Sequence, residues 1–218
     1  MLFPNLKNKC SRYLNLDVEA QKWLAAHPSR DMNPLLDADT CQKFVEELNR
    51  GLGLDFSYGG YLEDRSTLWR GSYLDADERY IHLGVDFNVP AGTSVAVPRP
   101  CSVIRVDNDY PERHGWGTRV FLQEPGAEVV LLFAHLDQKI EVVVGDRLEA
   151  GSIPAKVGVP PYNGDWFPHL HVQVIEGRHY EKLLENDLRE LDGYGRVQDI
   201  EVLKKNFRDP MGFLTIPL

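Results

Sequence analysis

The chain has 218 residues, of which 43% are hydrophobic and 26% are charged, as is usual for a soluble globular protein with one sizeable core. Its net charge of −9 and the lack of a Lys/Arg stripe argue against nucleic acid or an anionic membrane as a partner. No apolar run approaches the roughly 18 residues of a membrane-spanning helix. Composition leaves the oligomeric state open.

The start of the chain and its cysteines predict the compartment. Residues 1–10 lack the apolar segment of a secretory signal. The three cysteines are odd in number and scattered, which is typical of reduced thiols. They are Cys10, Cys41 and Cys101. We therefore expect a cytoplasmic protein.

Residues 1–55 are expected to be mainly helical. Residues 17–26 begin with Asp17 as a candidate N-cap. Residues 39–50 form the better helix, with Asp39 as a candidate cap, and apolar side chains recur on one of its faces at three- and four-residue steps. These apolar residues are Cys41, Phe44, Val45 and Leu48. Neither helix carries a catalytic motif, so both are expected to pack against a β core.

From Phe56 the pattern changes to short strands. Glycine-containing turns separate them at roughly 8–12-residue intervals, which predicts an antiparallel barrel or sandwich rather than βαβ units. The run 129–135 is apolar almost throughout, so it is expected to be buried on both faces. The expected strands span residues 79–87, 94–98, 102–106, 118–122, 129–135, 140–144, 153–157 and 168–174.

Helical periodicity returns near the C-terminus, over residues 178–191 and 198–206. The order α, then β, then α predicts an α+β fold, with an antiparallel β barrel or sandwich core and N- and C-terminal helices. We expect three parts: a helical extension over 1–58, the β core over 59–176, and C-terminal helices over 177–218 that pack on the core.

Histidines and one aspartate stand out in the expected β core. His169 and His171 share one face of a strand, because successive side chains alternate between its faces. His82 and Asp86 would lie about 13 Å apart in a fully extended strand. Gly84 between them permits a bend that would bring both toward the histidine pair. Imidazole nitrogens and carboxylate oxygens are donors that zinc prefers, and three of them would leave one position open for chemistry.

These positions, with His135 at the end of the apolar run, resemble the M23 (lysostaphin/LytM-like) zinc metallopeptidases. The resemblance covers roughly residues 59–176 and extends to the glycine-rich segments between the histidines. These segments are Gly84-Val85-Asp86-Phe87-x-x-Pro90-x-Gly92-Thr93, Gly115-Trp116-Gly117, Gly145-Asp146-Arg147-Leu148 and Asn163-Gly164-Asp165-Trp166-x-Pro168.

The resemblance implies a role for each of five residues. His82, Asp86 and His171 would bind Zn²⁺. His135 and His169 would be the catalytic pair, one as general base and the other stabilising the oxyanion or protonating the leaving amine. The sequence leaves open which of them is the base. It contains no H-E-x-x-H, which excludes a thermolysin-type glutamate base.

The implied activity is hydrolysis of a peptide or small amide by zinc-activated water. Family members are usually exported and cut cell-wall cross-bridges, whereas this chain shows no export signal. Residues 132–136 and 163–171 also resemble M23-type domains fused to aminotransferase and kinase-like modules. We therefore expect a peptidoglycan-derived or other small peptide as substrate.

Two other interpretations stay open. An M23-like fold could bind zinc as a scaffold with little hydrolysis, since a fold does not guarantee turnover. A cupin-type metalloprotein would use His169, His171 and Glu176 in an H-x-H-x-x-x-x-E pattern, but it leaves His82 and Asp86 without a role.

Other aromatic residues and histidines carry weaker expectations. Trp166 and Tyr162 are candidates for lining a substrate groove, with packing as the alternative. His27, His114 and His179 lie in helical or loop contexts and are expected to be solvated.

Overall fold

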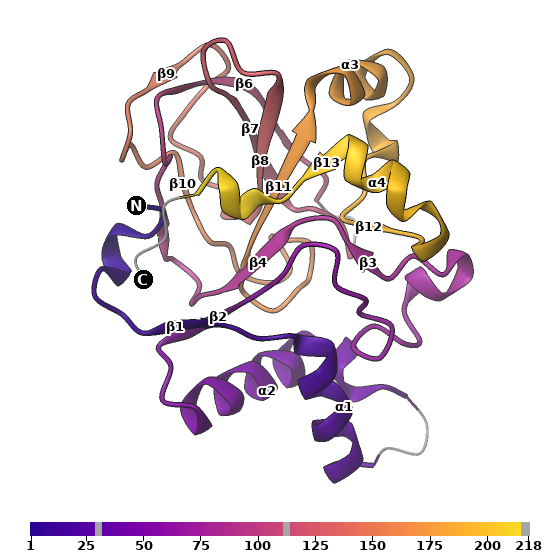
Figure 1. Cartoon of the computed structure of the whole chain (residues 1–218). Helices are drawn as coiled ribbons and strands as arrows, with labels where there is room; N and C mark the ends of the chain where they lie inside the picture. Colours follow the sequence, from indigo (N-terminus) through magenta and orange to yellow (C-terminus); the bar gives the residue numbers. More distant parts are fainter. Residues whose placement is uncertain (29–31, 111–113, 215–218) are drawn as a thin grey trace.

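The computed structural model describes residues 1–28, 32–110 and 114–214. Within them, a nine-stranded sheet runs in the order β1-β2-β4-β11-β8-β7-β6-β9, with β13 paired to β11 beside this path (Figure 1). Its strands are β1 (Ser11–Tyr13), β2 (Phe56–Gly59), β4 (Val85–Asn88), β6 (Cys101–Asn108), β7 (Thr118–Gln123), β8 (Val129–Leu136), β9 (Arg147–Leu148), β11 (Leu170–Glu176) and β13 (Phe207–Arg208). Two small sheets pair β5 (Ser94–Val95) with β10 (Ala155–Lys156), and β3 (Ile81–His82) with β12 (Tyr194–Gly195).

The strand pairs are antiparallel except for β1 and β2, which run parallel. The predicted α+β class is confirmed. The sheet is open, however, and does not close into a barrel. Segments from both ends of the chain extend it, because β1 pairs with β2 and β13 pairs with β11.

In the described parts of the chain, four α-helices lie in two groups. They are α1 (Leu16–Ala26), α2 (Ala38–Gly51), α3 (Gly177–Glu185) and α4 (Ile200–Asn206). Figure 1 shows α1 and α2 together at one end of the molecule, next to β1 and β2. The other two helices contact β11, and α4 also contacts β13. Among the described residues, no helix is long and apolar enough to cross a membrane.

Both N-terminal helices begin earlier than expected. Asn15 caps α1 by accepting a hydrogen bond from Val18 N at 3.1 Å, and Asp37 caps α2 in the same way. The predicted cap Asp17 instead accepts the backbone N–H groups of Thr67 and Leu68 at 2.7 and 2.8 Å. Its partners lie 50 residues away along the chain, which local capping patterns do not encode.

Three other expected elements differ from the structure. Residues 140–144 form no strand, because Val143 and Asp146 exchange two hydrogen bonds that close a turn. The short strand β9 lies where a turn was expected. The helix expected over 178–191 stops at Glu185 and is followed by a 3₁₀ turn at Leu188–Glu190.

Strand β8 is buried on both faces, as its apolar sequence predicts. Phe133 and Leu136 point into a cluster with β4 and β6, whereas Leu132 and Ala134 point into a second cluster that α3 covers. A third cluster joins α1 and α2 to the segment 68–74 and to Phe167, which precedes β11. Packing on all sides therefore fixes the strands that carry the predicted site.

Candidate metal centre

A break between β3 and β4 brings His82 and Asp86 together. Strand β3 ends at His82 and β4 begins at Val85, so the chain bends at Leu83 and Gly84 as predicted. A Cβ on Gly84 would lie 2.5 Å from Val172 O and 2.6 Å from His171 Cε1. Glycine is therefore required here for the bend to pack directly against β11.

Three of the predicted residues converge on one point. The ligand atoms of His82, Asp86 and His171 all lie within 4.8 Å of one another, and all three side chains are buried. His82 Nε2 is 3.2 Å from His171 Nδ1, which is 2.8 Å from Asp86 Oδ1. His82 donates its outer Nδ1–H to Gly60 O at 3.1 Å, which leaves Nε2 as a lone pair facing the cluster.

Asp86 is also held by a buried cation. Arg65 Nη1 donates to Asp86 Oδ2, and the same guanidinium pairs with Glu63 at 3.3 Å. The side chains of Arg65 and Glu63 are only 1% and 5% exposed. Tyr194 completes this network, with its hydroxyl 3.3 Å from Arg65 Nη1. The network anchors Asp86 Oδ2, which also lies 3.2 Å from His82 Nε2, while Oδ1 faces His171.

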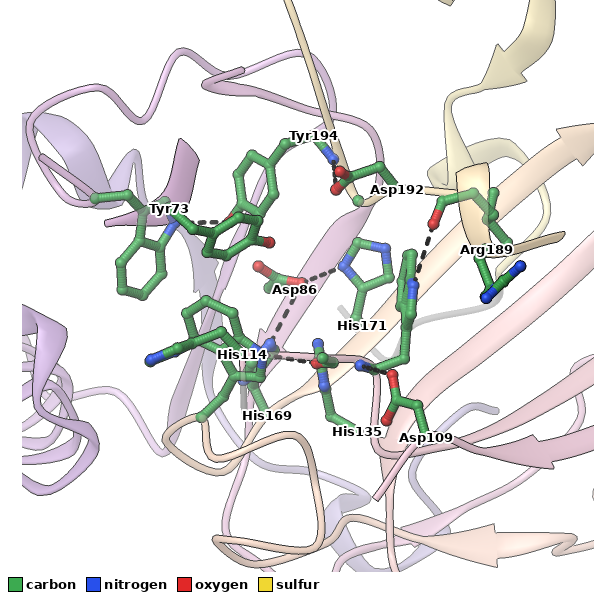
Figure 2. Close-up of a pocket in the computed structure, with 16 residues that line it drawn as sticks. Tyr73, Asp86, Asp109, His114, His135, His169, His171, Arg189, Asp192 and Tyr194 are labelled. Atoms are coloured by element: carbon green, nitrogen blue, oxygen red, sulfur yellow. Dashed lines mark hydrogen bonds and ion pairs between the residues drawn. The ribbon is translucent and has the colours of Figure 1, made fainter. Parts of the chain in front are cut away.

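His135 and His169 lie beside this cluster as a pair. Their ring centroids are 4.5 Å apart, and His169 Nε2 is 3.8 Å from Asp86 Oδ1. Each donates its Nδ1–H to a backbone carbonyl, His135 to Asn163 O at 2.8 Å and His169 to Phe167 O at 2.7 Å. Because a carbonyl can only accept, both imidazoles present Nε2 as a lone pair when neutral. Figure 2 shows both rings grouped around Asp86.

Burial sets the protonation of these groups. It lowers the pKa of His82 to about 4, and it also lowers the pKa of His169 and, most strongly, that of His135. Burial alone would raise the pKa of Asp86, but His82 and the Arg65 guanidinium outweigh it and hold that pKa well below its usual range. His82, His135 and His169 are therefore neutral beside an ionised Asp86, and a neutral imidazole and an ionised carboxylate are the forms that bind a cation.

The Gly115-Trp116-Gly117 motif supports the histidines from one side. Asp109 accepts the backbone N–H groups of Trp116 and Gly117 at 2.6 and 2.7 Å. The indole of Trp116 donates to Leu191 O at 3.2 Å and stacks against His135 with ring centroids 6.3 Å apart. The motif thus orients an aromatic wall of the site.

The Asn163-to-Trp166 motif supports them from another side. Asn163 is fully buried, accepts the His135 bond through its carbonyl, and donates its amide to Trp166 O at 2.9 Å. The indole of Trp166 donates to Gly115 O at 2.8 Å. His135 itself has a φ of +60°, an uncommon conformation for a residue with a side chain. These contacts hold it there, which directs its ring toward the cluster.

The site opens into a pocket of about 240 Å³ that four of the five predicted residues line. His82 is fully buried behind it. Trp166 lines the pocket, as proposed from the sequence, but Tyr162 does not. His114 is exposed, as expected, yet it lies at the pocket wall. Three aromatic residues that the sequence analysis did not single out also line the pocket: Trp69, Tyr73 and Tyr194.

The cupin interpretation does not fit this arrangement. Glu176, its proposed third ligand, lies at the far end of β11 and pairs with Arg208 on β13. It takes no part in the cluster around Asp86.

Several residues of the site were not found from the sequence. Arg65 and Glu63 precede the first histidine in a segment without a recognised motif, and Tyr194 comes from the C-terminal part of the chain. Gln173 lies on the same strand face as His171, two residues further on, and its side chain contacts that histidine at 2.9 Å. The alternation of side chains along β11 is the sequence signal that could have identified Gln173.

The donor set suits zinc. Two imidazoles and one carboxylate are the ligand types of catalytic zinc sites, which hold three protein ligands and leave one position open. Backbone or side-chain acceptors already occupy the outer nitrogens of both imidazoles, as is usual for metal-bound histidines. Among the described residues, three His, Cys, Asp or Glu side chains lie close enough to share an ion, and they are His82, Asp86 and His171.

Comparisons with known proteins give one family match and several similar solved structures. Residues 80–182 match the model of peptidase family M23. Among solved structures, the chain is similar to LytU, with 27% identity over 61% of this chain and 72% of that chain and a TM-score of 0.43. It is similar to the antimicrobial peptidase lysostaphin from Staphylococcus simulans, with 26% identity over 61% of this chain and 43% of that chain and a TM-score of 0.42.

A third similar structure is the catalytic domain of EnpA, a prophage-encoded M23 protein from Enterococcus faecalis. The identity is 26% over 44% of this chain and 69% of that chain, with a TM-score of 0.38. No curated protein gives a significant match. The family match covers the bend at Gly84, both catalytic-pair candidates and β11. Residues 80–182 of this chain are therefore similar in sequence to peptidase family M23.

Proposed function

We propose that this chain is a zinc-dependent metallopeptidase that hydrolyses a peptide bond. His82, Asp86 and His171 are the proposed metal ligands, and His135 and His169 the proposed catalytic pair. The observation that carries the proposal is the convergence of three buried donor atoms within 4.8 Å, beside two imidazoles that open on one pocket. The match of residues 80–182 to peptidase family M23 supports the same reaction class.

The metal and the two histidines of the catalytic pair would have different tasks in the reaction. When bound, zinc supplies Lewis-acid chemistry that polarises the scissile carbonyl and acidifies water. The chain supplies proton transfer. His135 and His169 are neutral and each presents Nε2 toward the pocket, so either can accept the proton of the attacking water. The imidazolium that forms is stabilised by Asp86 nearby and can pass the proton to the leaving amine.

A short peptide is the proposed substrate. The pocket of about 240 Å³ is lined by Trp69, Tyr73 and Tyr194 from segments outside the family match, which narrow the space around the candidate metal site. We propose a peptidoglycan-derived or other small peptide rather than an insoluble polymer. The net charge of −9 favours the same choice, because it would oppose adhesion to an anionic wall polymer.

Peptide hydrolysis with defined variants tests this proposal. Soluble muropeptides and glycine-containing peptides are incubated with the zinc-loaded protein, and products are followed by mass spectrometry. We expect cleavage that chelation abolishes and added zinc restores. The His135→Ala variant should keep its zinc and lose on the order of 10²–10⁴ in rate, the usual contribution of a general acid–base group.

The matched control is His27→Ala. His27 is an exposed histidine at the end of α1, outside the pocket, so the same substitution should leave the rate unchanged. Full zinc loading without cleavage of any peptide would contradict the proposed activity and favour a zinc-binding scaffold. Preferential lysis of insoluble sacculi would overturn the proposed substrate class alone.

A further inference from the structure

In the four histidines of the site, the ring nitrogen that points away from the cluster has one of two kinds of hydrogen-bond partner. His82, His135 and His169 each donate an N–H directly to a backbone carbonyl. His171 instead faces a side chain, with its Nε2 2.9 Å from Oε1 of Gln173. Gln173 is fully buried on the same face of β11. A buried amide aimed at a candidate metal ligand calls for a specific role.

The orientation of Gln173 follows from its second partner. Its other amide atom lies 3.3 Å from Asp192 O, a backbone carbonyl that can only accept. The atom facing Asp192 must therefore be the NH₂ group, and the atom facing His171 must be the oxygen. Since that oxygen can only accept, the proton of a neutral His171 lies on Nε2, and Nδ1 carries the lone pair.

The position of the His171 proton matters because Asp86 offers a second acceptor on the other side of the ring. Asp86 Oδ1 lies 2.8 Å from His171 Nδ1 and would draw the ring proton to that inner nitrogen. A proton on Nδ1 would occupy the atom that faces the cluster and block it as a ligand. We propose that Gln173 is a positioning residue for the metal centre, because it holds His171 in the tautomer that leaves Nδ1 free. This inference rests on the proposed function, which assigns His171 as a ligand.

The anchor of Gln173 lies outside the family match, which ends at residue 182. Asp192 belongs to a segment that is tied to the first ligand strand, because Leu83 N donates to Gly193 O at 2.8 Å and Tyr194 pairs with His82. The C-terminal segment therefore contributes to the metal centre through Gln173, although it supplies no ligand.

Zinc affinity tests the role of Gln173. The full chain and its variants are titrated with zinc against a chelator of known affinity, and folding is checked by circular dichroism. Gln173→Met keeps the side-chain volume but removes the acceptor, and should weaken zinc binding about 10–100-fold, as is usual when a partner of a metal-bound histidine is lost. Gln173→Glu keeps an oxygen toward His171 and should stay within about threefold of the wild type.

The control is Gln123→Met, since Gln123 also donates its amide to a backbone carbonyl, Ala127 O, but lies outside the site pocket. A purely packing role for Gln173 predicts the opposite order, because methionine is harmless in a core whereas a buried carboxylate is not. Unchanged zinc affinity in Gln173→Met would overturn the inference. If that variant does not fold, Gln173→Glu decides, and a folded Gln173→Glu that loses tenfold or more would overturn it. Zinc-free wild-type protein would instead overturn the proposed function.

Discussion

At the scale of single residues, the buried Arg65 is a cation that holds two buried carboxylates. Its guanidinium is 1% exposed and pairs with both Glu63 and Asp86. Removing the cation would leave two buried carboxylates facing each other, and breaking a buried pair from one side costs about 3–5 kcal/mol. We expect Arg65→Met to lose stability on this scale in urea-induced unfolding of the zinc-free protein.

Arg208→Met is the matched control for this prediction. Arg208 pairs with Glu176 at the surface, where its side chain is 47% exposed, and such pairs contribute less than about 1 kcal/mol. Equal losses for the two variants would contradict a special role of the buried network.

The five predicted site residues and Arg65 differ in how well the sequence could identify them. His82, Asp86, His135, His169 and His171 were predicted from motifs that resemble the M23 family, in which zinc chemistry restricts the residue types that can serve. Arg65 was not, since its partner Asp86 lies 21 residues further along the chain and no local spacing links them. Positioning groups depend on tertiary contacts and leave no comparable local pattern.

At the scale of secondary structure, the bend between β3 and β4 decides whether the site forms. Gly84 packs so closely on β11 that an added Cβ would lie 2.5 Å from the Val172 carbonyl oxygen. We expect Gly84→Ala to push the bend away from His171, to cost about 1–3 kcal/mol by overpacking, and to weaken zinc binding. Chelator competition and urea unfolding measure both effects.

Gly51→Ala serves as the comparison. Gly51 ends α2 with no atom within 4 Å of the added Cβ, so alanine should be neutral or stabilise by about 0.5–1 kcal/mol. If Gly84→Ala were as stable as Gly51→Ala and bound zinc with the same affinity, the close approach of Gly84 to β11 would not matter for the site.

Elements were predictable where their pattern was strong. The apolar run of β8 and the alternation of β11 were both found. Both strands are buried on both faces, and β11 alternates because the polar residues His171 and Gln173 share one face while Leu170, Val172 and Val174 share the other. Residues 140–144 were wrongly expected to be a strand. Their β-branched sequence suits one, but Val143 and Val144 are exposed and the Asp146 carboxylate closes a turn instead. The caps of α1 and α2 were misplaced by two residues. At α1 the reason is not local, because the expected cap Asp17 binds the backbone of Thr67 and Leu68 instead.

At the scale of the whole molecule, the proposed metal would link distant parts of the chain. His82 lies on β3, Asp86 on β4 and His171 on β11, so a shared ion would tie residues 89 positions apart. A ligand that binds only the folded state stabilises it, by ~2.7 kcal/mol at a free concentration a hundredfold above its Kd. We expect zinc to raise the Tm of the wild type and of His135→Ala, and to leave that of Asp86→Ala unchanged.

The open sheet was the feature of the whole molecule that the sequence could not resolve. A meander of short strands is compatible with a barrel, a sandwich or an open sheet. The two edges of the open sheet are β1 and β9, which have three and two residues. Strands of two or three residues carry too little periodicity to be predicted.

Zinc content measured by mass spectrometry, on protein purified without added metal, tests the central claim most directly. We expect about one equivalent in the wild type and in His135→Ala, but less than about 0.2 in Asp86→Ala, because a three-ligand site has no spare donor. Less than about 0.2 equivalents in the wild type, or full occupancy in Asp86→Ala, would contradict the assignment of His82, Asp86 and His171 as a zinc site.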